Sequence, residues 1–102
     1  IFVIGGSSEN CTHDALEVLD TLENRWTTLP PMPTARQGMG VAVIDERFIW
    51  TVGGCCGFNC SDVIEVFDVE KNEWKELTTK MTPARFGHSS IAAGHKVISI
   101  GG

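Results

Sequence analysis

The fold is decided by residues 48–54, which read Phe-Ile-Trp-Thr-Val-Gly-Gly. β-Branched and aromatic residues favour a strand, and a glycine pair ends it because glycine offers no side chain to pack. The same glycine pair follows an apolar run at Gly5-Gly6 and again at Gly101-Gly102, at a constant spacing of 48 residues. Self-similarity at a fixed period of this length indicates a repeat protein.

Further residues match when the chain is shifted by 48 positions. After Leu29 and Leu77 the register slips by one, so that Ala35-Arg36 meets Ala84-Arg85, and the spacing is restored before Val97. The remaining matched pairs are Asp14 with Asp62, Glu17 with Glu65, Val18 with Val66, Asp20 with Asp68, Asn24 with Asn72 and Trp26 with Trp74.

The apolar pattern within each period predicts short strands and no helix. No segment places apolar residues at helical spacing over three turns. The expected strands are 15–20, 26–29, 37–44, 48–52, 63–68, 74–78 and 87–93. Four short strands in about 48 residues are the content of one β-propeller blade.

Composition places the chain among globular proteins and disfavours two classes of partner. Of the 102 residues, 42% are apolar and 21% charged. The net charge is −5 and basic residues are scattered singly, so we expect no binding to nucleic acid. The longest apolar runs have four or five residues, so we expect no membrane partner either.

The cysteines Cys11, Cys55, Cys56 and Cys60 lie in two short loops, a poor framework for stapling a fold. We expect free thiols in a reducing compartment, and therefore a cytoplasmic protein. A redox-sensing thiol and a near-neighbour disulfide stay open as alternatives. The spacing lacks the paired C-x-x-C pattern of a zinc site. Asn10 and Asn59 each begin a glycosylation acceptor triplet, which leaves glycosylation open.

The repeat resembles the kelch repeat in the double glycine, in Glu-x-x-Asp and in the Trp after a turn. The segments Pro-Thr-Ala-Arg (33–36) and Pro-Ala-Arg (83–85) match it too. This resemblance covers essentially the whole chain and implies an all-β fold, a partial kelch β-propeller with one complete four-stranded blade at 37–78. Residues 1–36 would supply strands b, c and d of one blade, 37–84 a full blade, and 85–102 strands a and b of the next. Two periods are too few for a closed ring, so we expect a fragment of a larger propeller or self-association.

We expect no catalytic residue, cofactor or metal, and therefore no enzyme. Glu17 and Glu65 lie in mid-strand, where Arg36 or Arg85 from a neighbouring repeat could pair with them as structural partners. The glycine pairs end strands and precede no helix, so they form no phosphate loop.

The resemblance implies a protein-interaction module, because in kelch domains protein and peptide ligands dock on loops at one end of the central channel. A substrate adaptor of a ubiquitin ligase, an actin-binding protein, a segment of a propeller oxidase or lyase, and a spacer whose ligand contacts other blades are the more specific alternatives. The partner would be a protein or peptide, and an acidic one is an option because arginine binds carboxylates. The candidate partner-binding residues are Ser7, Ser8, Glu9, Asn10, Arg36, Gln37, Cys55, Cys56, Phe58, Asn59, Arg85 and Phe86.

Overall fold

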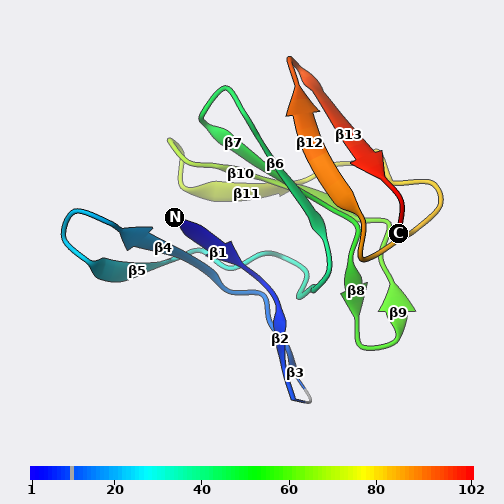
Figure 1. Cartoon of the computed structure of the whole chain (residues 1–102), viewed down its shortest axis with the longest axis horizontal. Coiled ribbons are helices and arrows are strands. Elements are labelled where there is room, and N and C mark those ends of the chain that lie inside the picture. Colours follow the sequence, from blue (N-terminus) through cyan, green and yellow to red (C-terminus); the bar gives the residue numbers. More distant parts are fainter. Residues whose placement is uncertain (10) are drawn as a thin grey trace.

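The computed structural model describes residues 1–9 and 11–102, which form antiparallel strands joined by turns and loops (Figure 1). These residues form no helix, and so none that could cross a membrane. The strands are β1 (Phe2–Ile4), β2 (Ser7–Ser8), β3 (Cys11–Thr12), β4 (Leu16–Asp20), β5 (Arg25–Leu29), β6 (Gly40–Ile44), β7 (Phe48–Val52), β8 (Cys55–Cys56), β9 (Asn59–Cys60), β10 (Ile64–Asp68), β11 (Glu73–Glu76), β12 (Ser89–Ala93) and β13 (Lys96–Ile100).

The longer strands form three sheets that follow one another along the chain. The first has the order β1-β4-β5, the second β6-β7-β10-β11, and the third consists of β12 and β13. Two small hairpins, β2–β3 and β8–β9, stand apart from them. The second sheet is the four-stranded unit that one repeat was expected to form.

Most expected strands are confirmed to within a few residues. The strand at 48–52 is β7 without change, whereas the one expected at 37–44 begins only at Gly40. The two small hairpins were not predicted, and their residues were expected to form loops. Their strands are two residues long, too short to show the alternation of apolar and polar residues that marks a strand.

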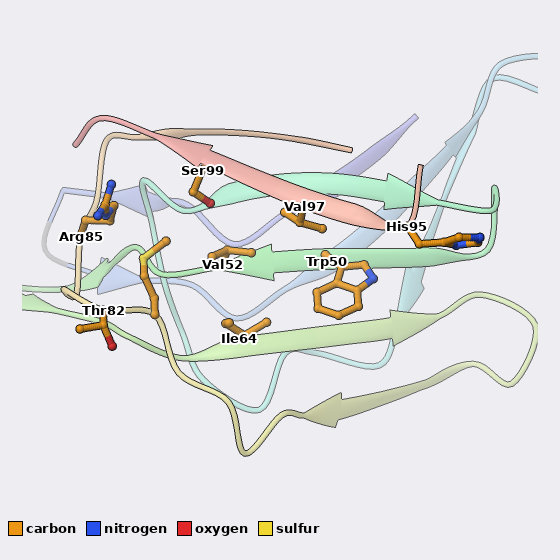
Figure 2. Close-up of a pocket in the computed structure, with 9 residues that line it drawn as sticks. Trp50, Val52, Ile64, Thr82, Arg85, His95, Val97 and Ser99 are labelled. Carbon is orange, nitrogen blue, oxygen red and sulfur yellow. The ribbon is translucent and has the colours of Figure 1, made fainter. Parts of the chain in front are cut away.

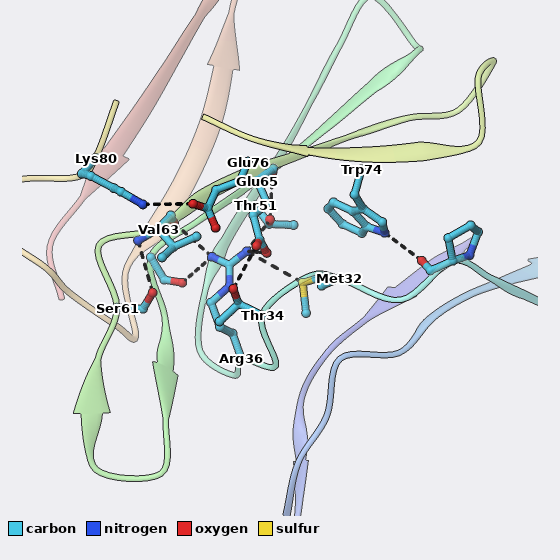
Figure 3. Close-up of polar contacts among 12 residues, drawn as sticks. Met32, Thr34, Arg36, Thr51, Ser61, Val63, Glu65, Trp74, Glu76 and Lys80 are labelled. Carbon is cyan, nitrogen blue, oxygen red and sulfur yellow. Dashed lines mark hydrogen bonds and ion pairs between the residues drawn. The ribbon is translucent and has the colours of Figure 1, made fainter. Parts of the chain in front are cut away.

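The core lies between the first and second sheets. Leu16 of β4 packs with Ile49 of β7 and Phe67 of β10, and all three are buried. Trp74 of β11 packs against Phe67, with the ring planes tilted by 49° and the ring centroids 5.2 Å apart. Its indole Nε1 donates a 2.7 Å hydrogen bond to the Pro30 carbonyl oxygen (Figure 3). Trp74 therefore joins two repeats.

The second and third sheets meet along their first strands, β6 and β12. This close approach depends on small residues. A Cβ atom on Gly40 would collide with the Ser90 side chain, and Ala42 on the same face of β6 is buried. Val41 and Val43 point to the opposite face and are exposed. The glycine at the start of β6 therefore sets the distance between two sheets.

The repeated glycine pair allows the next crossing segment to pass against the end of a strand. Gly53 and Gly54 have φ of 66° and 96°, in the region that side chains disfavour. The Gly54 N–H donates a 2.9 Å hydrogen bond to the Arg85 carbonyl oxygen. A Cβ atom on Gly53 would lie 2.7 Å from that same oxygen. The double glycine is thus required by contact between successive repeats.

The Arg36 side chain enters the second sheet from the segment that leads into it, and it is fully buried (Figure 3). Its Nη2 donates to Glu65 Oε1 at 2.8 Å and to Thr51 Oγ1 at 2.7 Å. Its Nη1 donates to the carbonyl oxygens of Gly53 at 2.7 Å and Val63 at 3.1 Å. Burial lowers the pKa of Arg36 and the Glu65 carboxylate opposes this. The pairing of an arginine with Glu65 is thereby confirmed.

We predict that Glu65→Gln lowers the free energy of unfolding by about 3–5 kcal/mol, because it leaves a buried guanidinium without its counter-charge. Arg36→Lys should be similarly harmful, since an ammonium lacks the fork that serves Glu65 and two carbonyl groups together. Urea denaturation measures both. The control is Glu23→Gln, whose exposed pair with Arg25 should contribute about 1 kcal/mol or less. Equal effects of Glu65→Gln and Glu23→Gln would contradict this role.

We also predict that stability falls as the pH drops below 6.5. Burial lowers the pKa of His88 from its ordinary value of 6.5, the Val52 backbone partly opposes this, and the positive charge of Arg85 adds to the lowering. The unfolded chain therefore takes up a proton at His88 before the folded chain does. Stability is lost from pH 6.5 down to the lowered pKa. Urea denaturation at pH 7.5 and 5.5 gives the free energy of unfolding at each pH. The decrease between the two should be smaller for His88→Gln than for the parent protein. An unchanged loss in that variant would rule out His88 as the source.

Candidate functional site

Two hairpins and two crossing segments gather at one end of the sheets, which we call the hairpin end. The β2–β3 and β8–β9 hairpins extend from the same side of the molecule (Figure 1). Gln37, in the segment before β6, exchanges two backbone hydrogen bonds with Cys55 at 2.8 and 2.9 Å. These bonds fix β8–β9 to the crossing segment. The hairpin therefore has a defined position on the sheets.

A two-residue turn places Phe58 at the tip of β8–β9. Gly57 has φ of 60°, and Phe58 is not among the residues with positive φ. A positive φ at the first central position only is the signature of a type II′ hairpin turn, which glycine favours. Phe58 is fully exposed there. Local turn chemistry thus presents an aromatic ring to solvent.

The first groove of the hairpin end lies between the two hairpins. The Gly57 N–H donates a 3.4 Å hydrogen bond to Thr12 Oγ1, which links the hairpins across the groove. The residues that line it are Ser7, Glu9, Cys11, Thr12, Gln37, Gly57 and Phe58. Four of them, Ser7, Glu9, Gln37 and Phe58, were candidate residues from the sequence.

The second groove lies on the other side of β8–β9, against the segment that leads into β12. Its lining residues are Cys60, Pro83, Ala84, Arg85, Phe86, Gly101 and Gly102. Phe86 is half exposed. Arg85 is partly buried, and its Nη1 donates to the Gly101 carbonyl oxygen at 3.0 Å. The β8–β9 hairpin therefore stands between two grooves.

The structure places most of the candidate residues on this end. Ser7, Ser8, Glu9, Cys56, Phe58 and Asn59 are exposed, and Gln37 is partly buried. Asn10 lies outside the described residues. Partner binding by these residues stays a prediction.

Two candidates are corrected. Arg36 is fully buried in its contacts with Glu65 and Thr51, so its guanidinium does not reach a partner. Cys55 is buried as well, with its backbone bonded to Gln37. Further blades could only cover these side chains more. Arg36 and Arg85 occupy matching positions in the repeat, but only the Arg36 side chain is fully buried. The repeat pattern therefore could not show which way the Arg36 side chain points.

Several residues that line the two grooves were not predicted from the sequence, among them Thr12, Gly57 and Cys60. Thr12 and Cys60 occupy matching places in the repeat, 48 residues apart, and each follows a proposed binding loop. Extending each loop by one or two residues would have included them. Gly57 could have been found from the preference of two-residue turns for glycine.

The charges at the hairpin end are few and of opposite sign. Glu9 contributes a carboxylate to the first groove, and Arg85 a guanidinium to the second. With Arg36 buried, attraction of an acidic partner rests on Arg85. Within residues 1–9 and 11–102, no three His, Cys, Asp or Glu side chains converge in a way that could hold a metal ion.

A third hollow lies between the second and third sheets and adjoins the second groove, because Arg85 lines both (Figure 2). Trp50 and Val52 of β7, Ile64 of β10, and Val97 and Ser99 of β13 line it. The third sheet has two described strands against four in the second, so β10 and β11 lack cover on this face. We assign this apolar hollow to packing between repeats.

Comparison with known proteins identifies the repeat. The model of the KLHDC2/KLHL20/DRC7 Kelch-repeats domain matches residues 1–102. Kelch-like protein 15 of Danio rerio is 33% identical over 104 residues, which cover 93% of this chain and 17% of that protein. An F-box/kelch-repeat protein of Arabidopsis thaliana is 30% identical over 104 residues, covering 100% of this chain and 28% of that protein.

The Rab9 effector protein with kelch motifs of Bos taurus is also similar, with 30% identity over 110 residues that cover 100% of this chain and 30% of that protein. The chain thus spans less than a third of the length of these relatives. The predicted all-β partial propeller is confirmed by the family match and by the four-stranded sheet. The chain belongs to the kelch-repeat family.

Proposed function

We propose that this chain is a protein-interaction module whose hairpin end binds a segment of a partner protein. The observation that carries the proposal is Phe58, a fully exposed aromatic ring that lines the first groove, at the tip of the hairpin that separates the two grooves. An exposed aromatic side chain on an ordered turn is a favourable anchor, since most binding energy comes from a few such residues. The sheets supply the rigid support that binding loops need.

The partner that fits best is an extended peptide segment lying across the β8–β9 hairpin. An apolar side chain of the segment would contact Phe58, and a second could contact Phe86 in the second groove. A carboxylate group on the segment could reach Arg85, which makes a single side-chain hydrogen bond among the described residues. An acidic, apolar-containing segment therefore suits this surface.

A role as the substrate-binding part of a ubiquitin-ligase adaptor is the more specific form of the proposal. Its support is the similarity to proteins named Kelch-like and F-box/kelch-repeat. The similarity to a Rab9 effector protein supports protein binding outside that role. A BTB or F-box sequence elsewhere in the full-length protein would favour the adaptor, and its absence would favour another interaction role.

We further propose that the chain acts without catalysis, in the cytoplasm. Among the described residues that line the grooves, no nucleophile is paired with a general base. Ser8 Oγ lies 2.9 Å from His13 Nε2 beside the first groove, but both side chains are exposed and neither lines a groove. An actin-binding protein and a non-catalytic segment of a propeller oxidase or lyase are the competing assignments. Metal analysis of the full-length protein separates the oxidase from the interaction module.

We predict that Phe58→Ala weakens peptide binding about tenfold or more without loss of folding. The physical reason is the loss of an anchor of about 1–3 kcal/mol from a side chain that makes no core contact. The measurement uses peptides selected from a random phage-displayed library on the full-length protein, with fluorescence anisotropy of each variant. Arg85→Ala should weaken the acidic peptides more than the neutral ones.

The matched control is Leu22→Ala. Leu22 is almost fully exposed and lies in the turn between β4 and β5, away from the hairpin end. This variant should bind the selected peptides like the parent protein. If Phe58→Ala and Leu22→Ala both keep full affinity, the hairpin end is not the binding surface.

A further inference from the structure

The two strands of the β8–β9 hairpin carry a pair of thiols in register. Cys55 of β8 is directly opposite Cys60 of β9, and Cys56 is opposite Asn59. All these cysteines are free thiols. Because directly opposite residues of an antiparallel pair share one face, the Cys55 and Cys60 side chains lie on the same side of the hairpin.

The backbone hydrogen bonds show which kind of pair this is. The N–H and C=O groups of Cys55 both bond to Gln37, so they point away from Cys60. The next pair along, Gly54 and Ser61, is joined by a hydrogen bond from Ser61 N–H to Gly54 C=O at 2.7 Å. Cys55 and Cys60 therefore form a non-hydrogen-bonded pair, in which Cα atoms lie about 4.5 Å apart and side chains approach most closely. A disulfide needs Cα atoms about 4.4–6.8 Å apart.

From this register we infer that Cys55 and Cys60 form a reversible disulfide that locks the hairpin carrying Phe58. The matching positions of the β2–β3 hairpin are Ser7 and Thr12, also directly opposite. The same backbone geometry thus occurs twice, and only the second hairpin carries sulfur at both places. Cys56 lies on the opposite face of the hairpin, away from the pair.

The exposure of the two thiols sets the order of the reaction. Cys60 is exposed and Cys55 is buried. A low-molecular-weight disulfide is the oxidant. The Cys60 thiolate attacks one of its sulfur atoms, forms a mixed disulfide and releases one thiolate. The Cys55 thiolate then attacks Cys60 Sγ, closes the Cys55–Cys60 bond and releases the second thiolate. Two electrons pass from the protein to the oxidant, and the two protons of the thiols pass to solvent.

The consequence for binding rests on the proposed function. A bond across the hairpin would remove the freedom of its two strands to separate at the base of the Phe58 turn. Oxidation would then change the affinity of the hairpin end for its peptide. Formation of the bond itself does not depend on any partner.

The test uses full-length protein, oxidised glutathione and mapping of alkylated thiols by mass spectrometry. Cleavage after Arg47 and Lys71 gives one peptide that contains Cys55, Cys56 and Cys60. On oxidation this peptide should lose two of its three alkylatable thiols and 2 Da in mass, and dithiothreitol should restore all three. Cys56→Ser should keep the loss of two thiols. Cys55→Ser should stop at a glutathione adduct on Cys60.

Retention of all three thiols, or a disulfide within this peptide (a loss of 2 Da) that still forms in Cys55→Ser, would overturn the inference. Peptide binding by the oxidised and reduced forms is a separate readout. If the bond forms and no library peptide binds either form, the thiol pair stands and the proposed function fails. If peptides bind through Phe58 and no bond forms, the proposed function stands and the thiol pair fails.

Discussion

The buried guanidinium of Arg36 is the contact on which the arrangement of these repeats depends. The Arg36 side chain extends from the segment that follows the first sheet, and its guanidinium lies inside the second sheet. There Glu65, Thr51 and two backbone carbonyl groups accept its hydrogen bonds. A buried charge is tolerated only when it is paired and hydrogen-bonded, so the crossing segment has one position relative to β7 and β10. That position also fixes Gln37, which holds the β8–β9 hairpin.

The molecule separates a repeated framework from variable hairpins. The glycine pairs recur because the end of the strand meets the next crossing segment at close range, and the pair of Arg36 with Glu65 joins that segment to the following sheet. The hairpins keep their backbone pairing and change their side chains, with Ser7 and Thr12 in one and Cys55 and Cys60 in the other. Chemistry can vary there because Ser7, Thr12 and Cys60 lie outside the buried core, with Cys55 as the buried exception.

The repeated framework could be predicted from the sequence, whereas the hairpins and the direction of individual side chains could not. The strand at 48–52 could be predicted without error because its β-branched and aromatic residues and its glycine pair are local signals. The small hairpins could not, since strands of two residues have no periodicity to detect. Phe58 was expected in an exposed loop and lies exposed in the turn of a hairpin, whereas Arg36 was placed on the binding surface although its side chain turns inward. Nothing local in the sequence distinguishes an arginine that points into a sheet from one that points to solvent.

By itself, the sequence determined the period, the strands and the family, because these depend on local propensity and on repetition along the chain. The tertiary structure decided which of two matching arginines is buried, which loops meet in a groove and which cysteines face each other. These features depend on contacts between residues far apart in the chain, such as Arg36 with Glu65 and Gly57 with Thr12. Their geometry is set only when successive sheets pack against one another.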